Sequence, residues 1–414
     1  MSIREQFVAT KKYNGIALAL MTLGALAIAG LYVTQGSKAD EHQQARFWAA
    51  LLHNSVYFLL VVNAAMFFIC ATTLAWGGWQ MAFRRVTEAI SAVVPVIGTI
   101  AGVILLVICF GNNHELYHWT DPVKAKTDAA FIWKAGFLNK NFFAGWTVFT
   151  IIAWSVLGWK MRLLSRKLDN EPLKTVEEGK KYIWNNTVWA AMFIIIFSLT
   201  VMSSIPWLWL MSIDAHWFST MYSWYTFASS FVAGVALITL YVVYLKNNDY
   251  LEYTNEEHLH DLGKFMFAFS IFWTYLWFSQ FMLIWYSNQP EETIYFIKRV
   301  GNTAKDSPYA GIFWLMFIIN FLAPLLILMR RSSKRNYTTI TFMSLLILFG
   351  HWLDFYQMVF PGPSPDHVPM ILYDFGIALF FVGLIMFVTG KALGRAPLLA
   401  KNHPFVKESL IHHT

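Results

Sequence analysis

Ten long apolar segments account for most of this chain, and they constrain its fold more than any other feature. About 20 consecutive apolar residues are enough to cross the hydrocarbon core of a bilayer as a helix. Charged residues make up only 13% of the sequence, roughly half the share of soluble domains. We therefore predict an all-α integral membrane protein with about ten transmembrane helices. The predicted spans are residues 14–34, 47–75, 86–111, 141–160, 184–211, 218–245, 262–287, 311–329, 337–360 and 370–393.

The distribution of Lys and Arg predicts the orientation of these helices. With ten spans, both termini share a side of the membrane with the connections after the second, fourth, sixth and eighth spans. That side holds 22 of the 31 basic residues. Because cytoplasmic loops carry an excess of Lys and Arg, we expect both termini in the cytoplasm. The net charge of +7 then reflects topology, and nucleic-acid binding is excluded because no basic groove or stacking platform is evident.

The first segment follows a basic start and contains Ala27-Ile28-Ala29, which resembles a signal-peptide cleavage site. Its apolar run is longer than a signal-peptide core, which favours a helix that is retained. The two cysteines, Cys70 and Cys109, both lie inside predicted spans. Without any CxxC or CxxCH pair, the sequence excludes a zinc ribbon, covalent haem and an iron–sulfur cluster, and we predict no metal site.

The order of the segments predicts two groups of four helices, flanked by the first and the last helix. Residues 47–211 form the expected first bundle and residues 218–360 the second, within one polytopic membrane domain, 1–414. In each group the third helix ends in a basic run and the fourth in a polar, Trp-rich stretch. This similarity favours a parallel repeat, although topology alone imposes part of it.

Aromatic residues gather near the predicted span ends, which an interfacial belt explains without a cofactor role. They are Trp207, Trp209, Trp217, Trp224, Trp285, Tyr286 and Trp352.

The ninth span contains the strongest candidates for chemistry. His351, Asp354 and Gln357 are spaced three apart, so they share one helix face. At 1.5 Å per residue, His351 lies about 14 Å and Asp354 about 9 Å from the periplasmic end of the span. A carboxylate at that depth needs a partner, water or a raised pKa. We weigh a proton acceptor or quinol contact against a polar clamp between helices.

Further ionisable residues lie toward the same face. His53 has a depth comparable to that of His351, and Asp374 lies about one turn into the last span. Asp214 and His216 follow the fifth span, where a solvated rim is the simpler interpretation. On the cytoplasmic side, which is barer, Glu88 follows Arg84 and Arg85, and an interfacial ion pair is expected. Together with His351 and Asp354, these residues are the candidate proton path or quinol contact.

Haem ligation by His53 and His351 is the alternative for the two histidines. Their similar depth on different helices permits axial coordination. A haem pocket favours small residues beside each ligand, however, and the neighbours here include Leu52, Asn54 and Trp352. The sequence therefore disfavours haem, and the clustered histidines of a haem–copper oxidase are absent from it.

Two stretches resemble a known family. Residues 209–220 read WLMSIDAHWFST, and the segment from Asp261 to Glu292 begins DLGKF and ends IWYSNQPEE. Together with the basic run at 330–336 and Leu353-Asp354, they resemble the ActF-type NrfD-like membrane subunits of bacterial alternative complex III. Relatives often carry an acidic residue where this chain has Leu208, which weakens transfer of a quinol site to the fifth span.

The resemblance implies a subunit of a quinol:cytochrome c oxidoreductase in the bacterial inner membrane. It implies partners that carry the redox centres: a periplasmic iron–sulfur subunit, multihaem cytochrome c subunits, a paralogous quinol-binding subunit, small membrane anchors and, in some complexes, a terminal oxidase. No tightly bound cofactor is expected in this chain, although menaquinone, ubiquinone and structural phospholipids are candidate ligands. The rival hypotheses are a purely structural anchor and a secondary transporter.

Overall fold

A computed structural model describes residues 5–111, 113–302, 306–365 and 369–413. Those residues form helices and contain no β-strand, apart from one isolated bridge between Gly301 and Asp306. Ten helical segments among them are long and apolar enough to cross a membrane. The predicted all-helical membrane fold with ten spans is therefore confirmed.

Each of the ten spans overlaps one predicted segment, and most of their ends lie within a few residues of the predicted positions. They are α1 with a π-helical turn (Lys11–Gly36), α2 (Glu41–Leu74), α3 and α4 (Arg84–Phe110), α7 (Lys140–Asn170), α8 and α9 with an intervening π-helical turn (Val176–Trp209), α10 (Met221–Lys246), α11 (Glu256–Ser287), α13 and α14 with an intervening π-helical turn (Ala310–Leu328), α16 (Tyr337–Val359) and α17 (Ile371–Leu393). Shorter helices are α5 (Lys124–Thr127), α6 (Ala129–Lys134), α12 (Pro290–Val300), α15 (Arg331–Arg335) and α18 (Val406–Leu410).

Two helices continue well beyond the apolar windows that predicted them. Helix α7 reaches Asn170 instead of residue 160, and α8 starts at Val176 instead of residue 184. A hydropathy window detects only the apolar part of a helix, whereas the backbone stays helical until a cap ends it. Thr175 provides such a cap, since its hydroxyl accepts a hydrogen bond from the Glu178 amide.

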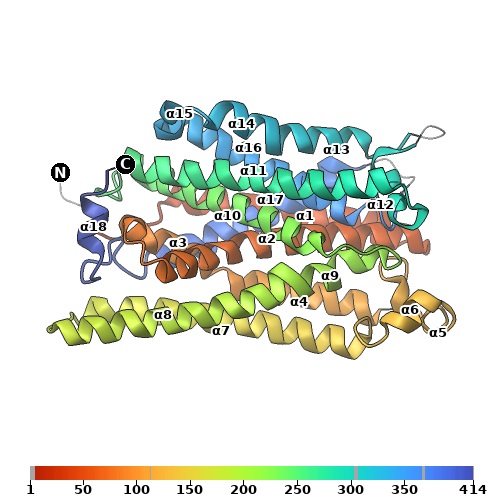
Figure 1. Ribbon diagram of the computed structural model, residues 1–414, viewed down its shortest axis with the longest axis horizontal. Coiled ribbons are helices and arrows are strands. Elements are labelled where there is room, and N and C mark those ends of the chain that lie inside the picture. Colours follow the sequence, from red (N-terminus) through yellow and green to blue (C-terminus); the bar gives the residue numbers. More distant parts are fainter. Residues whose placement is uncertain (1–4, 112, 303–305, 366–368, 414) are drawn as a thin grey trace.

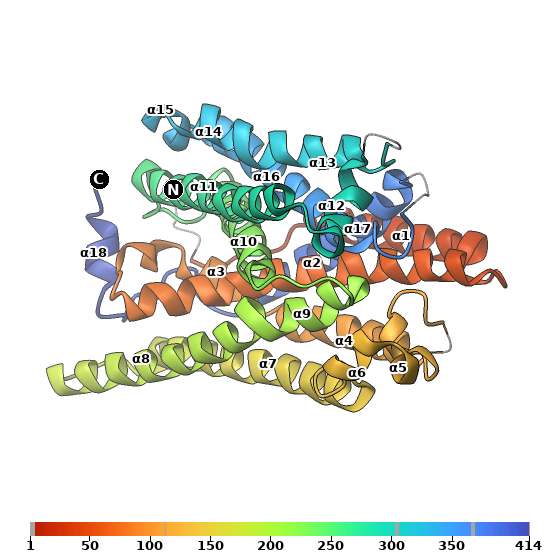
Figure 2. The same cartoon turned by 45° about the vertical axis from the view of Figure 1, so that its right-hand side comes forward.

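Helices α2 and α10 form the centre of the molecule. In their most apolar windows, 83% of the α2 residues and 89% of the α10 residues are buried, against 17% for α1. The two central helices contact each other, and α2 also contacts α4, α8, α16 and α17. Figures 1 and 2 show the other long helices arranged around them. Side chains that meet inside the bundle therefore come from α2, α10 and their direct neighbours.

The remaining contacts follow chain order. Helices α4 and α8 pack against α2, and α7 packs against α4 and α8. Helices α11 and α16 pack against α10, with α13 against α16 and α14 against α11 and α16. Helices α1 and α17, from opposite ends of the sequence, pack against each other. Gly24 makes this close approach possible, because a Cβ atom there would lie 2.3 Å from the backbone nitrogen of Phe380. The division into two bundle units stays a prediction.

Two spans contain a π-helical turn directly before a proline. The turn at residues 200–204 precedes Ile205-Pro206, and the turn at residues 318–322 precedes Ala323-Pro324. Proline lacks the amide hydrogen of a helix and collides with the carbonyl one turn earlier. A π turn inserts an extra residue and relieves that conflict, and such turns often mark functional sites. Asn320 lies in the second turn.

The described chain starts and finishes at the same end of the molecule, on the left in Figure 1. We call it the terminal end; it includes Lys11, Leu74, Arg84 and Lys246. The far end includes Lys140, Trp209 and the start of α17.

The prediction that seven aromatic residues form an interfacial belt is wrong for three of them. Trp209, Trp217 and Trp352 are buried, with exposed fractions of 0%, 3% and 2%, because they pack inside the bundle or under the loops at the far end.

Candidate functional site

Asp354 lies at the centre of a buried cluster that joins three spans. Its Oδ2 atom accepts hydrogen bonds from Ser229 Oγ at 2.7 Å and from Trp273 Nε1 at 2.8 Å. The Tyr225 hydroxyl donates to Oδ1. Tyr225 and Ser229 lie one turn apart on α10, Trp273 on α11 and Asp354 on α16. Three neutral donors from two other helices thus converge on one carboxyl group.

Ser229 connects Asp354 to His351. His351 Nδ1 lies 2.9 Å from Ser229 Oγ and 3.8 Å from Asp354 Oδ2, and neither ionisable side chain is exposed. A serine hydroxyl carries one proton. If that proton points to Asp354, Ser229 can only accept from a protonated His351 Nδ1. If Asp354 is protonated and donates to Ser229, the hydroxyl donates to a bare Nδ1. These two hydrogen-bond orders differ by the transfer of one proton between His351 and Asp354.

The charge on Asp354 is compensated without a permanent cation. Within the part of the chain that the structure describes, no Lys or Arg forms an ion pair with this carboxyl group, and His351 is its basic neighbour. A carboxylate is costly to place in a dry interior, but hydrogen bonds to the charged form stabilise it. Because His351 can gain or lose a proton, the cluster can change its net charge. A carboxylate paired with Arg gains a proton less readily, because the permanent cation stabilises its ionised form.

The other ring nitrogen of His351 is a candidate point of proton entry. This atom, Nε2, is buried and makes no hydrogen bond to a described residue. The amide of Asn320, in the π-helical turn at 318–322, is also buried and makes no such bond. It packs against Gly350, where a Cβ atom would lie 2.1 Å from Asn320 Oδ1. Buried polar atoms of this kind are commonly paired with ordered water.

A row of aromatic side chains leads from the Asp354 cluster toward the far end. The Tyr225 and Tyr222 rings lie 6.4 Å apart, and Tyr222 lies 6.4 Å from the Tyr295 ring. The guanidinium carbon of Arg299 then sits 3.3 Å from the centroid of Tyr295. Burial raises the pKa of Tyr295, on α12 outside the spans, to about 12. The Tyr295 phenol therefore keeps its proton at neutral pH. The row is held by ring contacts, and the buried Tyr222 hydroxyl makes no hydrogen bond to a described residue.

The row ends at Asp214, in the connection between α9 and α10. Lys298 Nζ lies 2.5 Å from Asp214 Oδ1, and an Arg299 nitrogen lies 3.6 Å from Oδ2. Burial opposes ionisation, but the two cations outweigh it and hold the pKa of the Asp214 carboxyl below its usual value. The sequence-based interpretation of Asp214 as a solvated rim residue is wrong. Helix α12 covers this carboxylate and leaves its side chain 10% exposed.

A small cavity of about 170 Å³ lies beside Asp214 at the far end, lined also by His118 and His216. His216 is a rim residue, as expected: its side chain is 63% exposed and its Nε2 lies 2.7 Å from Asp128 Oδ2. Burial, reinforced by Lys124, lowers the pKa of His118. The aromatic row therefore extends from the Asp354 cluster to a cavity at the far end whose mixed lining includes Asp214, His118 and His216.

His53 and Asp374 belong to a second buried cluster. An Arg46 nitrogen lies 2.9 Å from Asp374 Oδ2. Asn54 donates from its amide to the Asp374 carbonyl at 3.2 Å and accepts from Trp352 Nε1 at 2.9 Å. His53 Nε2 lies 2.9 Å from the Trp352 carbonyl. These contacts join α2, α16 and α17. None of them involves Asp354 or its hydrogen-bond partners, so His53 and Asp374 belong to a different network.

The two histidines do not fit a shared haem. His53 Nε2 is hydrogen-bonded to the Trp352 carbonyl. The rings of Tyr356 and Phe360 form T-shaped contacts with the His53 ring, with centroids 5.5 and 5.7 Å away. His351 Nδ1 lies 2.9 Å from Ser229 Oγ, and the Trp273 and His351 rings meet at 83° with their centroids 5.5 Å apart. Aromatic side chains thus occupy the space where a porphyrin would lie. In the described ranges, no group of three or more His, Cys, Asp or Glu residues is arranged to hold a metal ion.

Glu88 lies in an ionic cluster at the terminal end. Its two carboxylate oxygens lie 3.0 Å from Arg84 Nε and 3.1 Å from an Arg85 nitrogen, which confirms the expected ion pair. Arg85 also pairs with Asp169 at 2.7 Å. The burial of these groups was not anticipated: Arg84, Arg85 and Glu88 are at most 4% exposed. Glu88 therefore has cationic partners of its own, apart from His351 and Asp354.

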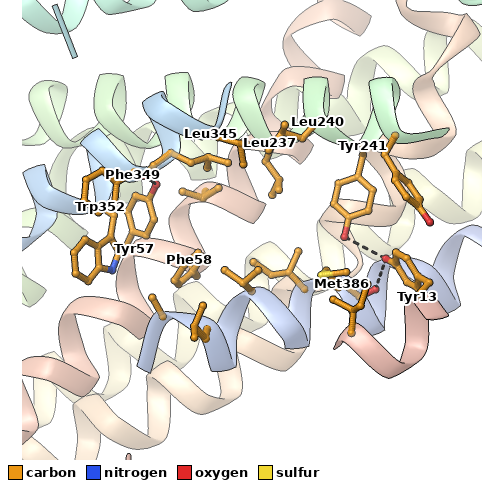
Figure 3. A pocket seen from close by; sticks show the side chains of 18 of the residues that line it. Tyr13, Tyr57, Phe58, Leu237, Leu240, Tyr241, Leu345, Phe349, Trp352 and Met386 are labelled. Carbon is orange, nitrogen blue, oxygen red and sulfur yellow. Dashed lines mark hydrogen bonds between the residues drawn. The ribbon is translucent and has the colours of Figure 1, made fainter. Parts of the chain in front are cut away.

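A larger cavity of about 840 Å³ lies between α1, α2, α10, α16 and α17 (Figure 3). Tyr57 and Trp352 line one end of it. The Tyr57 hydroxyl donates to the Leu348 carbonyl at 2.6 Å, and Trp352 Nε1 donates to Asn54. A binding site orients a quinone ring through a few donors aimed at its carbonyl oxygens. With both donors already used, this end of the cavity does not fit a quinone ring.

Sequence reasoning did not identify four of the residues that define these clusters. Tyr225 and Ser229 are spaced i, i+4 on one face of α10, but small polar and aromatic residues are common in spans. Trp273 was part of the family-like stretch without an assigned role. Arg46 lies one residue before the predicted second span, so the sequence predicts a position in the preceding loop. Its position inside α2, buried against Asp374, became evident only from the packing.

No protein-family model matches the chain, and a comparison with curated proteins finds no match.

Proposed function

We propose that this chain is a membrane subunit of a respiratory quinol:cytochrome c oxidoreductase in which the His351–Ser229–Asp354 cluster holds and transfers a proton. The observation that carries the proposal is a fully buried carboxyl group whose basic neighbour is a histidine reached through one hydroxyl. Ionisable residues inside membrane spans are costly, and they commonly mark proton or ion pathways. The resemblance to NrfD-like subunits supports the respiratory context.

The proposed step conserves every proton. A proton on His351 Nδ1 passes to Ser229 Oγ while the Ser229 proton passes to Asp354 Oδ2. An imidazolium and a carboxylate become a neutral imidazole and a carboxylic acid. The reverse step restores the first state. Tyr225 and Trp273 keep their protons and hold the carboxyl group in place. No bond is formed or broken apart from those to protons.

The arrangement of charges supports a proton exit at the far end. The aromatic row from Tyr225 to Tyr295 leads to Asp214 and the small cavity beside it. The excess of Lys and Arg on the connections at the terminal end favours a cytoplasmic location for both termini. The far end then faces the periplasm, where the proposed iron–sulfur and haem c partners would oxidise quinol. The chain would hold no redox centre of its own.

A structural anchor is the competing function. The hydrogen bonds of Asp354 also link α10 and α11 to α16 and stabilise their packing. In that case the Asp354 cluster contributes only stability, and a change that preserves assembly leaves proton movement intact. A proton-transfer role instead requires the Ser229 hydroxyl itself.

Gentle purification of the tagged chain from its native membranes tests the respiratory assignment. We expect haem c and iron–sulfur subunits to co-purify and the isolated complex to oxidise quinol. A lone homo-oligomer without redox partners would contradict the assignment. Ser229→Ala and Ser229→Thr complexes then separate the two functions. The proton-transfer role predicts slower turnover-linked proton release for Ser229→Ala and recovery with Ser229→Thr, whereas an anchor predicts equal release.

A further inference from the structure

The 840 Å³ cavity extends along the membrane spans. Its lining residues include Phe375 and Met386 on α17, Leu237 inside α10 and Asn248 just beyond the end of α10. Each pair is eleven positions apart, which corresponds to about 16 Å along a helix. Its volume lies within the range of roughly 300–1,000 Å³ typical of ligand sites. The cavity has room for a long, narrow molecule.

One side of this cavity opens toward the surroundings of the spans. Ile16, Leu345 and Phe375 line it and are 44%, 56% and 42% exposed. Val61 and Phe58 form its floor and are buried. Because the open side lies on membrane spans, we expect bilayer lipids to reach it. The apolar walls favour a hydrocarbon chain.

The two ends of the cavity differ in polarity. At the end near Trp352 and Tyr57, the polar hydrogens already bind protein groups, which leaves an apolar surface. At the opposite end, Tyr13 and Tyr241 lie near the start of α1 and the end of α10 (Figure 3). Lys12 lines the cavity there and is exposed. A lysine ammonium at a membrane surface attracts anionic headgroups.

We infer that this cavity binds one acyl chain of an anionic phospholipid, with the phosphate at Lys12 and the chain end near Trp352. The orientation follows from the polarity of the two ends. The chain would fill the space between the α1–α17 pair and helices α10 and α16. This inference does not depend on the proposed proton transfer, since none of the cavity residues belongs to the Asp354 cluster.

Filling the cavity tests the site of the acyl chain. Ala378 lines the cavity and is 3% exposed. Ala378→Phe places a ring in the space of the acyl chain, whereas the matched Ala25→Phe changes an exposed position of α1 outside the lining. Native mass spectrometry of the protein in mild detergent measures retained phospholipid. We expect retention by wild type and Ala25→Phe and loss by Ala378→Phe. Equal retention by folded Ala378→Phe would overturn the inference.

Neutralising the lysine tests the headgroup. Lys12 and Lys11 are adjacent exposed lysines, and only Lys12 lines the cavity. A basic residue near an anionic membrane surface contributes about a fivefold preference for the anionic lipid. We expect Lys12→Gln to reduce the retained ratio of phosphatidylglycerol to phosphatidylethanolamine about fivefold. Lys11→Gln should leave that ratio close to wild type. Equal effects of the two variants would overturn the assignment of the phosphate to Lys12.

Photo-crosslinking of the unmodified chain locates the acyl chain even if a variant fails to fold. Wild-type protein in nanodiscs would receive phosphatidylglycerol with a diazirine at the end of one acyl chain. We expect peptide adducts on Phe349, Trp352 or Tyr57, with competition by unlabelled phosphatidylglycerol. Adducts confined to exposed residues outside the cavity would contradict the inference. If a short-chain ubiquinone displaced the label and phospholipid did not, the ligand of the cavity would be a quinone, and the inference would be overturned.

Discussion

Arg46 and Asp374 form an ion pair 2.9 Å long inside the protein, although they are 328 positions apart in the chain. The pair joins α2 to α17, and neither side chain is more than 5% exposed. Phe360 lies under the guanidinium group at 4.7 Å. Removal of one member of a buried pair leaves the other charge uncompensated, which is more damaging than the loss of both.

Arg46→Gln and Asp374→Asn are each expected to destabilise the protein by about 3–5 kcal/mol. The double variant should be more stable than the sum of the two single effects predicts, because no uncompensated charge remains. Denaturant titration of all four proteins in the same detergent measures this coupling. Additive effects would show that the pair does not contribute as a unit.

Ser229→Ala removes the hydroxyl between His351 and Asp354. Loss of a hydrogen bond to a charged group is expected to lower stability by about 1.5–3 kcal/mol. General acid–base steps typically contribute about 10²–10⁴ in rate, so we expect turnover-linked proton transfer to slow by at least tenfold. Trp273→Phe also removes one donor to Asp354 but leaves the His351–Ser229–Asp354 contacts in place, so we expect it to lower stability without slowing proton transfer. Equal proton kinetics in the two variants would exclude Ser229 from the transfer.

Asp214 gives the protein a pH-dependent contribution to stability at the far end. Its pKa is lower in the folded protein than the ordinary value of 3.8, mainly because Lys298 and Arg299 outweigh the effect of burial. The contribution is therefore fully present above pH 3.8 and disappears as the pH falls through the lower, folded value. We expect Asp214→Asn to be less stable than wild type at pH 7. The difference should shrink below about pH 4. Thermal unfolding at several pH values measures it.

Gly350→Ala is expected to disturb the His351 side of the site. The new methyl group would lie 2.1 Å from Asn320 Oδ1 and 2.4 Å from Ile319 Cγ2, so the π-helical turn would have to move. Overpacking of this kind costs about 1–3 kcal/mol. Gly15→Ala, in α1 with nothing within 4 Å of the new atom, is the matched control. It should be neutral or slightly stabilising, because alanine favours a helix by up to about 1 kcal/mol over glycine. Equal stabilities would contradict this account.

The sequence was sufficient to predict the spans because long apolar helices are recognisable without knowledge of their neighbours. It also placed His351 and Asp354 on one face, since residues three apart are adjacent on any helix. The structure places their side chains 3.8 Å apart. The helix ends were less predictable. The polar residues from Arg162 to Asn170 continue α7 outside the apolar window.

The partners of Asp354 could not be predicted from the sequence. Tyr225, Ser229 and Trp273 reach it only because α10 and α11 pack against α16, and hydropathy contains no information about which helices are neighbours. The same reason explains the error at Asp214. Its cations come from α12, 84 residues later for Lys298, in a segment read as a connection between spans.

The central claim, that Asp354 accepts a proton during turnover, is tested most directly by proton release from the intact complex in liposomes. Asp354→Asn keeps the size of the side chain but removes the site that gains and loses a proton. Thr274→Val, at a buried position one residue after Trp273 on α11, is the control for loss of a buried polar group that does not contact Asp354. We predict that assembled Asp354→Asn complex loses at least tenfold in the rate of turnover-linked proton release. Wild-type proton release by a fully assembled Asp354→Asn complex would contradict the claim.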